Sequence, residues 1–395
     1  MTKNSHSSAK DKFSILIPDG ESPFALSVII CLSQLPGLRI YILASDRWAL
    51  ARFSIHSTVF LYSKKPGSNE QWIDAIQDMV HEHGIDIVLP VDEPAIRALT
   101  IYGEALLSST AIVPLPKQES FDIAADKWLT AKFLDVNNLP GPPTVLYDTA
   151  NQLEQSLSGL SFPVLTKPRQ GRGGNGIEFW EDISTLRNYL QKYSSSKKII
   201  IQSFIKGFSI DCSVLSQDGK ILAHTIQKEL VPPQHRFEPA RDIVFLENGE
   251  IFKSVEHLIS FLKWSGVVHI DLLYDEQDNS FKILELNPRY WGSLLGSLCA
   301  EVNFPYLACL AGFNREFPRP EFRLQPFFRG RGAIEAFVQH ILQKAALKGC
   351  FANTNIQYGL RDPLLVLVKI INLIQKRLFK HNRLAACSRT YFGRE

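Results

Sequence analysis

The sequence predicts an α/β protein of several domains, and three observations support this. Short apolar segments alternate with helical patterns over residues 13–114, which is typical of a parallel sheet covered on both faces. A glycine-rich stretch follows an apolar strand near residue 170. Two further apolar segments near residue 280 flank a short polar linker. With 395 residues, 45% of them hydrophobic, the chain is long enough for two or three domains with their own cores.

The first domain is expected to be Rossmann-like and to follow a flexible polar tail, residues 1–12, that lacks the apolar core of a signal peptide. Strands are expected at 13–17, 38–43, 58–62 and 86–89, and helices at 23–35 and 70–83. Ligands bind beyond the carboxyl ends of such strands, so the loops at Asp19–Ser22, Ser45–Trp48 and Asp92–Glu93 are candidates for substrate contact. Asp and Ser also suit turns and helix caps, which is the structural alternative.

The segment Pro163–Ile177 combines an apolar strand, Lys167 and four glycines within six residues. These glycines are Gly171, Gly173, Gly174 and Gly176. Glycines let backbone N–H groups approach phosphates closely, and consecutive amides form an anion-binding concavity. The segment is therefore a candidate phosphate loop.

Three phosphate-binding motifs compete for this segment. Residues 171–176 fit G-x-G-x-x-G, but the dinucleotide fingerprint needs a helix directly afterwards, and residues 177–180 are expected to form a strand before a helix at 182–192. A Walker loop ends in Gly-Lys-Ser/Thr, whereas Lys167 precedes the glycines. The catalytic-loop and metal-loop signatures of a protein kinase are absent from the sequence. What remains is a lysine-bearing strand, a glycine hairpin and a distant pair of acidic strands.

The two apolar segments near residue 280 carry the candidate metal ligands. Their polar linker predicts a hairpin. Side chains two apart on a strand share a face, so Glu285 and Asn287 are expected together, with Asp271 of the partner strand beside them. Two carboxylates and an amide suit Mg²⁺, with Mn²⁺ as the alternative ion, and Arg289 follows for a phosphate or carboxylate. A solvated hairpin edge is the structural alternative. His269 shares the face of Asp271, and a packing or supporting role is expected for it.

These motifs resemble the ATP-grasp superfamily, in the branch related to the carbamoyl-phosphate synthetase large subunit and to amino-acid ligases. The resemblance spans about residues 13–315. It implies an ATP-grasp fold behind an N-terminal pre-grasp domain, with ATP closed between two α+β subdomains. It further implies that ATP and Mg²⁺ convert a carboxylate to an acyl phosphate, which an amine then attacks.

The resemblance also implies roles for individual residues. Lys127 and Lys167 contact the phosphates, and Arg289 steadies the transferring group, so Lys167 and Arg289 are the expected catalytic residues. The metal ions are held by Asp271, Glu285 and Asn287. The glycine hairpin closes over the phosphates and the intermediate.

The adenine-binding segment implied by the resemblance lies around Phe204 and Ile205, whose backbone binds the purine edge. Gln202 stands where a glutamate is common in the family. Ser209 stands where a ribose-binding glutamate often lies, and Asp211, two positions later on the same face, is the alternative ribose ligand.

A long polar stretch, residues 225–245, is expected to be a loop and a candidate substrate lid. Within it, Lys228 and Arg241 are candidates for binding anionic substrate groups, while His235 is expected to be solvated. Asp92 and Glu93 of the first domain are further substrate candidates.

Composition and patterning limit the partners. The 43 basic and 40 acidic residues give a formal net charge of +3, which is too balanced for a nucleic-acid-binding protein. Six cysteines without a C-x-x-C pair indicate reduced thiols and a cytoplasmic location. No stretch approaches 18 apolar residues, so no membrane span is expected. Residues 363–380 predict a basic amphipathic helix that packs on the body of the protein, with contact to an anionic membrane as the alternative.

The predicted organisation places the small subdomain with the glycine loop at 115–200, the metal-binding subdomain at 201–330 and a helical extension at 331–395. The predicted function is an ADP-forming, Mg²⁺-dependent carboxylate–amine ligase for small-molecule or amino-acid substrates. A nucleotide-binding sensor without ligase activity, and an ATP-grasp enzyme that activates bicarbonate or a carbamate, are the alternatives. The oligomeric state is open, with a homodimer as one alternative.

Overall fold

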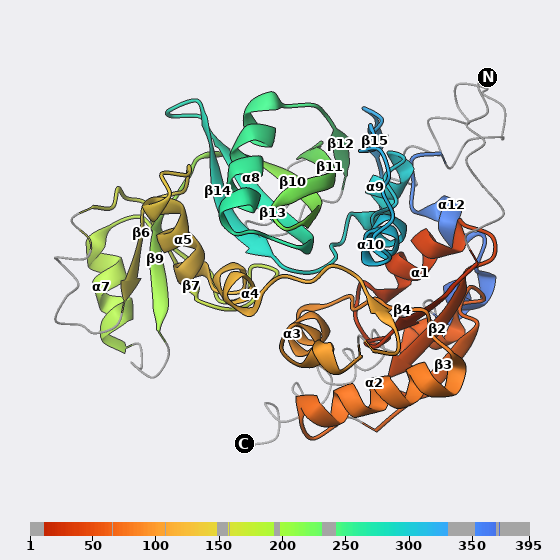
Figure 1. The fold of residues 1–395 in the computed structure, drawn as a ribbon. Helices are drawn as coiled ribbons and strands as arrows, with labels where there is room; N and C mark the ends of the chain where they lie inside the picture. The colour runs from red at the N-terminus through yellow and green to blue at the C-terminus, as the bar shows by residue number, and fades with distance from the viewer. Residues whose placement is uncertain are drawn as a thin grey trace, which may run out of the picture.

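Three β-sheets organise the chain, and Figure 1 shows them as three lobes in a row. The structure, a computed structural model, describes residues 12–64, 66–106, 108–147, 157, 159–192, 198–230, 242–330, 352–368 and 371. The N-terminal lobe carries a five-stranded sheet, the opposite lobe a four-stranded sheet, and the central lobe a six-stranded sheet.

The N-terminal sheet is parallel, with strand order β3-β2-β1-β4-β5. Its elements are β1 (Ser14–Ile17), α1 (Ala25–Ser33), β2 (Arg39–Ala44), β3 (Val59–Tyr62), α2 (Asn69–His83), β4 (Ile87–Val88), α3 (Glu93–Tyr102) and β5 (Ala111–Ile112). The parallel, Rossmann-like sheet expected from the sequence is therefore confirmed. The strand order changes direction between β1 and β4, and the loops that follow these two strands meet there.

The loop after β1 and the loop after β4 are joined by a buried carboxylate. Asp19 accepts hydrogen bonds from the backbone N–H groups of Val91 (3.1 Å) and Asp92 (2.7 Å). Burial raises the pKa of Asp19 well above its ordinary value, with Asp92 and Glu21 adding to the rise and the two backbone donors opposing it. Asp92 in turn caps α3 by accepting from the N–H of Glu93. The capping alternative thus applies to Asp92, while Asp19 holds the Asp92–Glu93 loop in one position through the two backbone N–H groups.

The four-stranded sheet has the order β6-β9-β7-β8 and carries the glycine-rich segment. Its elements are β6 (Thr144–Tyr147), β7 (Val164–Pro168), β8 (Glu178–Trp180), α7 (Ile183–Lys192) and β9 (Ile199–Ser203). A strand, β8, follows the glycines, so the dinucleotide fingerprint is excluded as the sequence predicted. The predicted boundary at residue 200 falls inside β9, and we propose that this subdomain extends to Ser203.

The central sheet has the order β14-β13-β10-β11-β12-β15. Its strands are β10 (Gly207–Gln217), β11 (Lys220–Glu229), β12 (Ile243–Phe245), β13 (Gly266–Asp275), β14 (Ser280–Asn287) and β15 (Pro326–Phe327). The expected hairpin is confirmed as β13 and β14. The expected loop over 225–245 is wrong at both ends. β11 continues to Glu229 and β12 begins at Ile243, and these two strand ends pair with each other.

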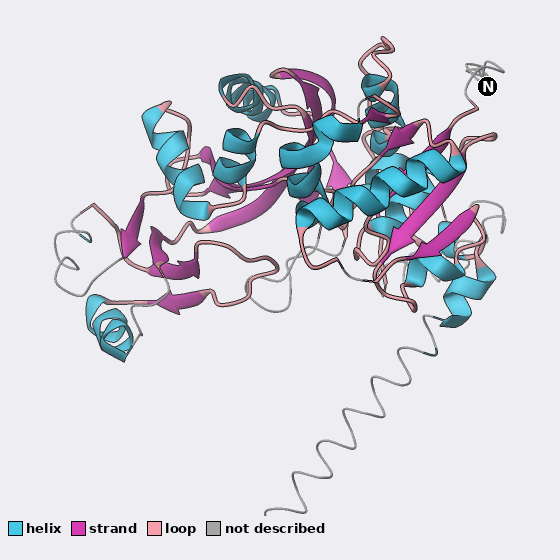
Figure 2. Cartoon of the chain, turned by 60° about the horizontal axis from the view of Figure 1, so that its bottom comes forward, coloured by secondary structure: helices cyan, strands magenta, loops and turns pink. Residues whose placement is uncertain are grey.

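Helices cover both faces of the central sheet. On one face, α4 (Gln118–Ala124), α5 (Lys127–Val136) and α8 (Gly249–Phe261) pack in a cluster with Trp264, which is fully buried. On the other face lie α9 (Leu294–Cys299) and α10 (Phe304–Gly312), between the central sheet and the N-terminal sheet (Figure 1). Figure 2 shows the helices and strands of the same chain after a turn of 60°. The helices α4 and α5 fall within residues 115–200, the predicted small subdomain, but they pack in the core of the central lobe.

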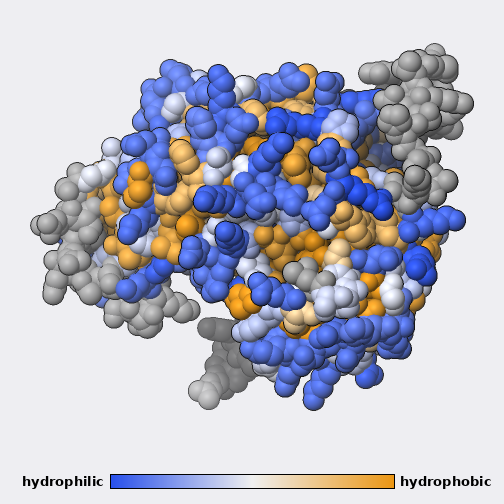
Figure 3. All heavy atoms as spheres, in the orientation of Figure 1, coloured by the Kyte–Doolittle hydropathy of each residue, from blue (hydrophilic) through white to orange (hydrophobic). Residues whose placement is uncertain are grey.

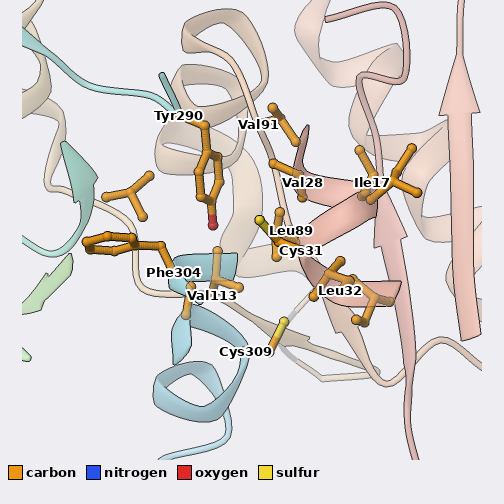
Figure 4. Packing of buried hydrophobic residues seen from close by; sticks show 14 of the residues in the cluster. Ile17, Val28, Cys31, Leu32, Leu89, Val91, Val113, Tyr290, Phe304 and Cys309 are labelled. Atoms are coloured by element: carbon orange, nitrogen blue, oxygen red, sulfur yellow. The ribbon is translucent and has the colours of Figure 1, made fainter. Parts of the chain in front are cut away.

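One hydrophobic cluster joins the N-terminal and central lobes. Figure 4 shows Tyr290 and Phe304 beside Val28, Cys31 and Val113. Leu215 and Val267 contribute to the same cluster from the central sheet. Burial of this kind stabilises by about 25 cal/mol per Å² of apolar surface, so the two lobes form one packed body. The position of the Asp92–Glu93 loop relative to β14 is a consequence of that packing.

Gly207 gives a stability prediction because it begins β10 directly against β13. A Cβ atom at this position would lie 1.6 Å from the carbonyl oxygen of Tyr274, which is backbone and does not move without breaking strand pairing. We expect Gly207→Ala to lower the free energy of unfolding by about 2 kcal/mol or more, as overpacking does. Urea denaturation followed by circular dichroism measures this change.

The matched control for that prediction is Gly249→Ala. A Cβ at Gly249, the first residue of α8, would meet no atom within 4 Å. Alanine is also the better helix former, so the control should keep or slightly raise the urea midpoint. Equal midpoints for the two variants would show that β10 is free to move away from β13, contrary to the pairing described.

The C-terminal segment packs against the N-terminal lobe through part of its surface. Ser54 Oγ donates to Asp362 Oδ2 at 2.6 Å, and Leu365 is buried. Four other side chains recur at helical spacing and are exposed, namely Leu360, Leu364, Leu367 and Ile371. The rest of the predicted 363–380 helix lies outside the described residues.

Within the described part of the chain, no helix is both long and apolar enough to cross a bilayer. Figure 3 shows a largely hydrophilic face with hydrophobic residues mainly at its centre and over the small sheet.

Candidate functional site

Lys127 ties the glycine loop to the acidic hairpin. It is the first residue of α5, and its Nζ lies 2.9 Å from the carbonyl oxygen of Gly171 and 2.9 Å from Glu285 Oε2. The preceding residue, Asp126, caps the helix by accepting from two backbone N–H groups and forms an ion pair with Arg169 at 2.7 Å. The helix start therefore positions one lysine between a backbone loop and a carboxylate on different sheets.

The glycine loop uses backbone conformations that favour glycine. Gly173, Gly174 and Gly176 have φ angles of 66°, 74° and 76°, and Gly171 has 138°. The loop is also tethered to the N-terminal lobe, because Arg172 lies 3.0 Å from Asp92 Oδ2. The four glycines named from the sequence therefore lie in one loop that reaches from the small sheet to the loop after β4.

Lys167 lies on β7 behind this loop and is 7% exposed. Its Nζ donates to Gln202 Oε1 at 2.6 Å, and Gln202 Nε2 donates to Thr144 Oγ1 at 2.8 Å. Burial lowers the pKa of Lys167 to about 8, with Lys127 acting in the same direction and Glu285 and Asp271 opposing it. The lysine is thus a buried cation whose partner is a neutral amide rather than a carboxylate.

This pKa predicts a pH dependence of anion binding. Lys167 is charged below its pKa of about 8 and neutral above it, so affinity for a non-hydrolysable ATP analogue should fall as pH rises from 8 to 10. Gln202→Glu would place a negative charge beside Nζ, raise the lysine pKa and move the fall to higher pH. Calorimetric titrations between pH 7 and 10 measure both curves. Affinities that do not change over this range would show that Lys167 does not meet the phosphates.

The β13–β14 hairpin brings the three predicted metal-ligand residues together. The register pairs Asp271 with Glu285 and His269 with Asn287. Asn287 Nδ2 lies 3.2 Å from Asp271 Oδ2 and 3.4 Å from Glu285 Oε1, so the amide faces both carboxylates. Two carboxylates converge on this point, and a divalent cation with oxygen ligands would fit between them in place of the amide N–H, whereas the amide oxygen Oδ1 faces Arg289.

The two carboxylates of the hairpin are held in different electrostatic states. Burial, Glu285 and Asp211 raise the pKa of Asp271 well above its ordinary value. Burial would raise the pKa of Glu285 as well, but Lys127 and Lys167 outweigh it and lower this pKa to about 2. Glu285 therefore carries a negative charge at neutral pH, while burial and the neighbouring carboxylates disfavour ionisation of Asp271.

Arg289 is buried directly after the hairpin and fully engaged. Its Nη2 donates to Asn287 Oδ1 at 2.8 Å, and its Nε lies 3.0 Å from Glu93 Oε1. The next residue, Tyr290, donates its backbone N–H to the carbonyl oxygen of Val91 at 3.1 Å. Two of the sequence-predicted substrate residues, Asp92 and Glu93, are thus paired with Arg172 and Arg289, which places them at the edge of the same site.

The segment predicted to hold a nucleoside lies beside Lys167. The N–H of Phe204 already donates to the carbonyl oxygen of Pro163 at 2.9 Å. Of the two backbone N–H groups predicted to bind a purine edge, that of Ile205 is therefore the better candidate. The N–H of Ser209 donates to Glu229 Oε1 at 3.1 Å. Asp211, the alternative ribose ligand, lies directly opposite Asp271 in the pairing of β10 with β13.

Four contributors to this region were not singled out from the sequence: Arg169, Arg172, Gln227 and Glu229. Gln227 lies opposite Asp211 on β11, and Glu229 is two residues further along the same strand. Residues 227–229 are three consecutive polar residues, so no alternation in the sequence marks them as a strand, and they were assigned to a loop. Lys228, between them, has its Nζ 3.6 Å from the centre of the Phe208 ring. Arg241 and His235 lie outside the described residues.

Residues 124–293 match the family described as ATP-grasp domain. A carbamoyl-phosphate synthase of Methanobrevibacter smithii is 22% identical over 249 residues, covering 58% of this chain and 66% of that protein. A tetrahydromethanopterin:alpha-L-glutamate ligase of Methanocaldococcus jannaschii is 28% identical over 183 residues, covering 43% and 60%. The chain thus spans somewhat less than two thirds of the length of these curated relatives.

Solved structures share the fold at low sequence identity. The L-amino acid ligase from Bacillus licheniformis superposes with a TM-score of 0.56 at 21% identity, covering 76% of this chain and 73% of that one. N5-carboxyaminoimidazole synthetase from Staphylococcus aureus, in complex with ADP, gives a TM-score of 0.63 at 13% identity, with 84% and 87% covered. Both likenesses extend beyond residues 124–293 and so include part of the surrounding lobes.

Proposed function

We propose that this chain, which carries an ATP-grasp domain at residues 124–293, is an ATP-dependent carboxylate–amine ligase that forms an amide through an acyl phosphate. The observation that carries the proposal is the position of Lys127, whose Nζ contacts both the glycine loop and Glu285. A nucleotide whose phosphates lie beneath the loop would therefore meet two lysines and the acidic hairpin at once. The similarity to a tetrahydromethanopterin:alpha-L-glutamate ligase supports the reaction class.

The chain's own residues account for the phosphoryl step. Lys127 and Lys167 offset the negative charge of the phosphates, and Arg289, oriented by Glu93 and Asn287, lies where it can meet the transferring phosphoryl group or the acyl phosphate. Phosphoryl transfer needs mainly positioning and electrostatic stabilisation, so no side-chain nucleophile is required. A divalent ion bound by Asp271, Glu285 and Asn287 would neutralise charge that develops on the phosphate oxygens.

The second step joins the acyl phosphate to an amine and releases phosphate. A glycine loop tethered by Arg172 to Asp92 would exclude water from the intermediate while the amine enters. Small carboxylates and amines are therefore the proposed substrates, with Mg²⁺ as the proposed ion and Mn²⁺ as the alternative. The cytoplasm is the proposed compartment. Light scattering after gel filtration would detect a homodimer.

A screen for ADP release tests the proposal. Carboxylic acids are crossed with amino acids and other amines, in the presence of ATP and Mg²⁺, and ADP is measured with a coupled assay. We expect release that requires one acid and one amine together. Release that needs bicarbonate and no amine would favour the activation of bicarbonate instead. Tight nucleotide binding without turnover by any pair would favour a sensor.

A further inference from the structure

A cluster of nitrogen and oxygen ligands lies at the acidic hairpin, and the ligase proposal uses only one of its members, Asp271. Its members are Asp211 on β10 and His269 and Asp271 on β13, whose ligand atoms all lie within 4.8 Å of one another. His269 Nε2 is 3.4 Å from Asp271 Oδ1 and 3.8 Å from Asp211 Oδ2. The other oxygen of Asp271, Oδ2, accepts from Asn287 Nδ2 at 3.2 Å. We propose that Asp211, His269 and Asp271 form a separate site for a first-row transition-metal ion such as Mn²⁺.

The imidazole is held in a ligand orientation. Ser213, fully buried, places its Oγ 2.9 Å from His269 Nδ1, so that Nε2 points toward the two carboxylates. Trp291 stacks on the ring with centroids 5.5 Å apart and planes 11° apart. Histidines that bind metals usually bond a second group through the other ring nitrogen, which fixes the orientation of the ring. Sequence reasoning gave His269 only a packing or supporting role.

A second observation comes from Gln227. It is 2% exposed, and its Nε2 donates to Asp211 Oδ2 at 3.1 Å. Its Oε1 is buried without a hydrogen-bond partner among the described residues. A buried amide oxygen without a partner costs about 1–3 kcal/mol. Rotation of the amide by half a turn would exchange the two atoms, so that this oxygen faces the cluster in place of Nε2 and a cation bound there would satisfy it.

The distances distinguish a metal ion from an ammonium group. Ligands at about 2.1 Å from one ion lie about 3.0–3.4 Å from each other. Three acceptors around an ammonium group, each at about 2.9 Å, lie about 4.7 Å apart. The two separations to His269 Nε2, 3.4 and 3.8 Å, are closer to the first arrangement. One imidazole with two carboxylates also selects Mn²⁺ and its neighbours over Mg²⁺, which prefers an all-oxygen shell.

Manganese alone, without nucleotide, is the probe for the test. Full-length protein is titrated with Mn²⁺ by electron paramagnetic resonance in the presence of excess Mg²⁺, and pulsed measurements detect imidazole ¹⁴N coupled to the bound ion. We expect one tightly bound Mn²⁺ with this coupling. His269→Gln should remove the coupling and weaken Mn²⁺ binding by about 10-fold or more, and Asp211→Asn should weaken binding to a similar extent. His257→Gln, an exposed histidine on α8, should change neither.

Bound Mn²⁺ without nitrogen coupling, or equal affinities in wild type and His269→Gln, would overturn this inference. The wild-type spectrum decides the first point without any variant, so poor folding of a variant does not hide the answer. The inference does not depend on the ligase proposal. If ADP release depends on acid and amine but bound Mn²⁺ shows no nitrogen coupling, only the manganese site is wrong. If bound Mn²⁺ shows the coupling but no pair of substrates gives turnover, only the ligase proposal is wrong.

Discussion

Glu285→Gln is expected to reduce ATP turnover at least about 100-fold while leaving the fold intact. The substitution keeps the shape of the side chain but removes the charge that pairs with Lys127 at 2.9 Å and faces the Asn287 amide. Loss of a single positioned electrostatic group typically costs 10²–10³ in rate. Because Glu285 is the carboxylate that stays ionised at neutral pH, its loss also removes the proposed ion's main anionic ligand. ADP release with a productive acid and amine measures the effect.

The control for this prediction is Glu276→Gln, which alters an exposed glutamate in the turn of the same hairpin. It should release ADP at the wild-type rate. Circular dichroism and thermal unfolding show whether both variants fold. Unchanged turnover in Glu285→Gln would remove β14 from the catalytic site, whatever the control does.

Lys167→Ala is expected to weaken nucleotide binding by about 10- to 100-fold. Hydrogen bonds to charged groups contribute about 1.5–3 kcal/mol each, and a buried lysine makes its phosphate contact away from competing water. The truncation also leaves Gln202 Oε1 without its donor. Calorimetric titration with a non-hydrolysable ATP analogue measures the dissociation constant.

The matched control is Lys220→Ala, an exposed lysine at the start of β11, far in sequence from the glycine loop. It should leave the dissociation constant unchanged. If Lys167→Ala binds the analogue as tightly as wild type, the phosphates lie elsewhere. If both variants weaken binding equally, the effect comes from overall charge and not from the position of Lys167.

The hairpin was predictable because its geometry follows from local rules. Alternation and a polar linker were sufficient to pair Asp271 with Glu285 and to put Asn287 on the same face. The alternating strands and helices of the N-terminal lobe followed in the same way. The strand after the glycines was also predictable, and it excluded the dinucleotide fingerprint. In each case the determining interactions lie within a few residues of one another.

Contacts between lobes were not predictable, because they depend on how distant segments pack. Nothing local indicates that Glu93 meets Arg289 or that Arg172 meets Asp92. The first pair is brought together by the cluster around Tyr290 and Phe304, and the second joins the glycine loop to the loop after β4. The roles of Gln227 and Glu229 were missed for a different reason. The polar residues of β11 give the sequence pattern of a loop, because one face of this strand lines the site instead of the core.

The measurement that tests the central claim most directly is a crystal structure with Mg²⁺ and a non-hydrolysable ATP analogue. We predict that the phosphates lie beneath Gly171–Gly176, in contact with Lys127 and Lys167, with an ion bound to Asp271 and Glu285. Phosphates found on another surface, with the two carboxylates still bonded to the Asn287 amide, would contradict the account.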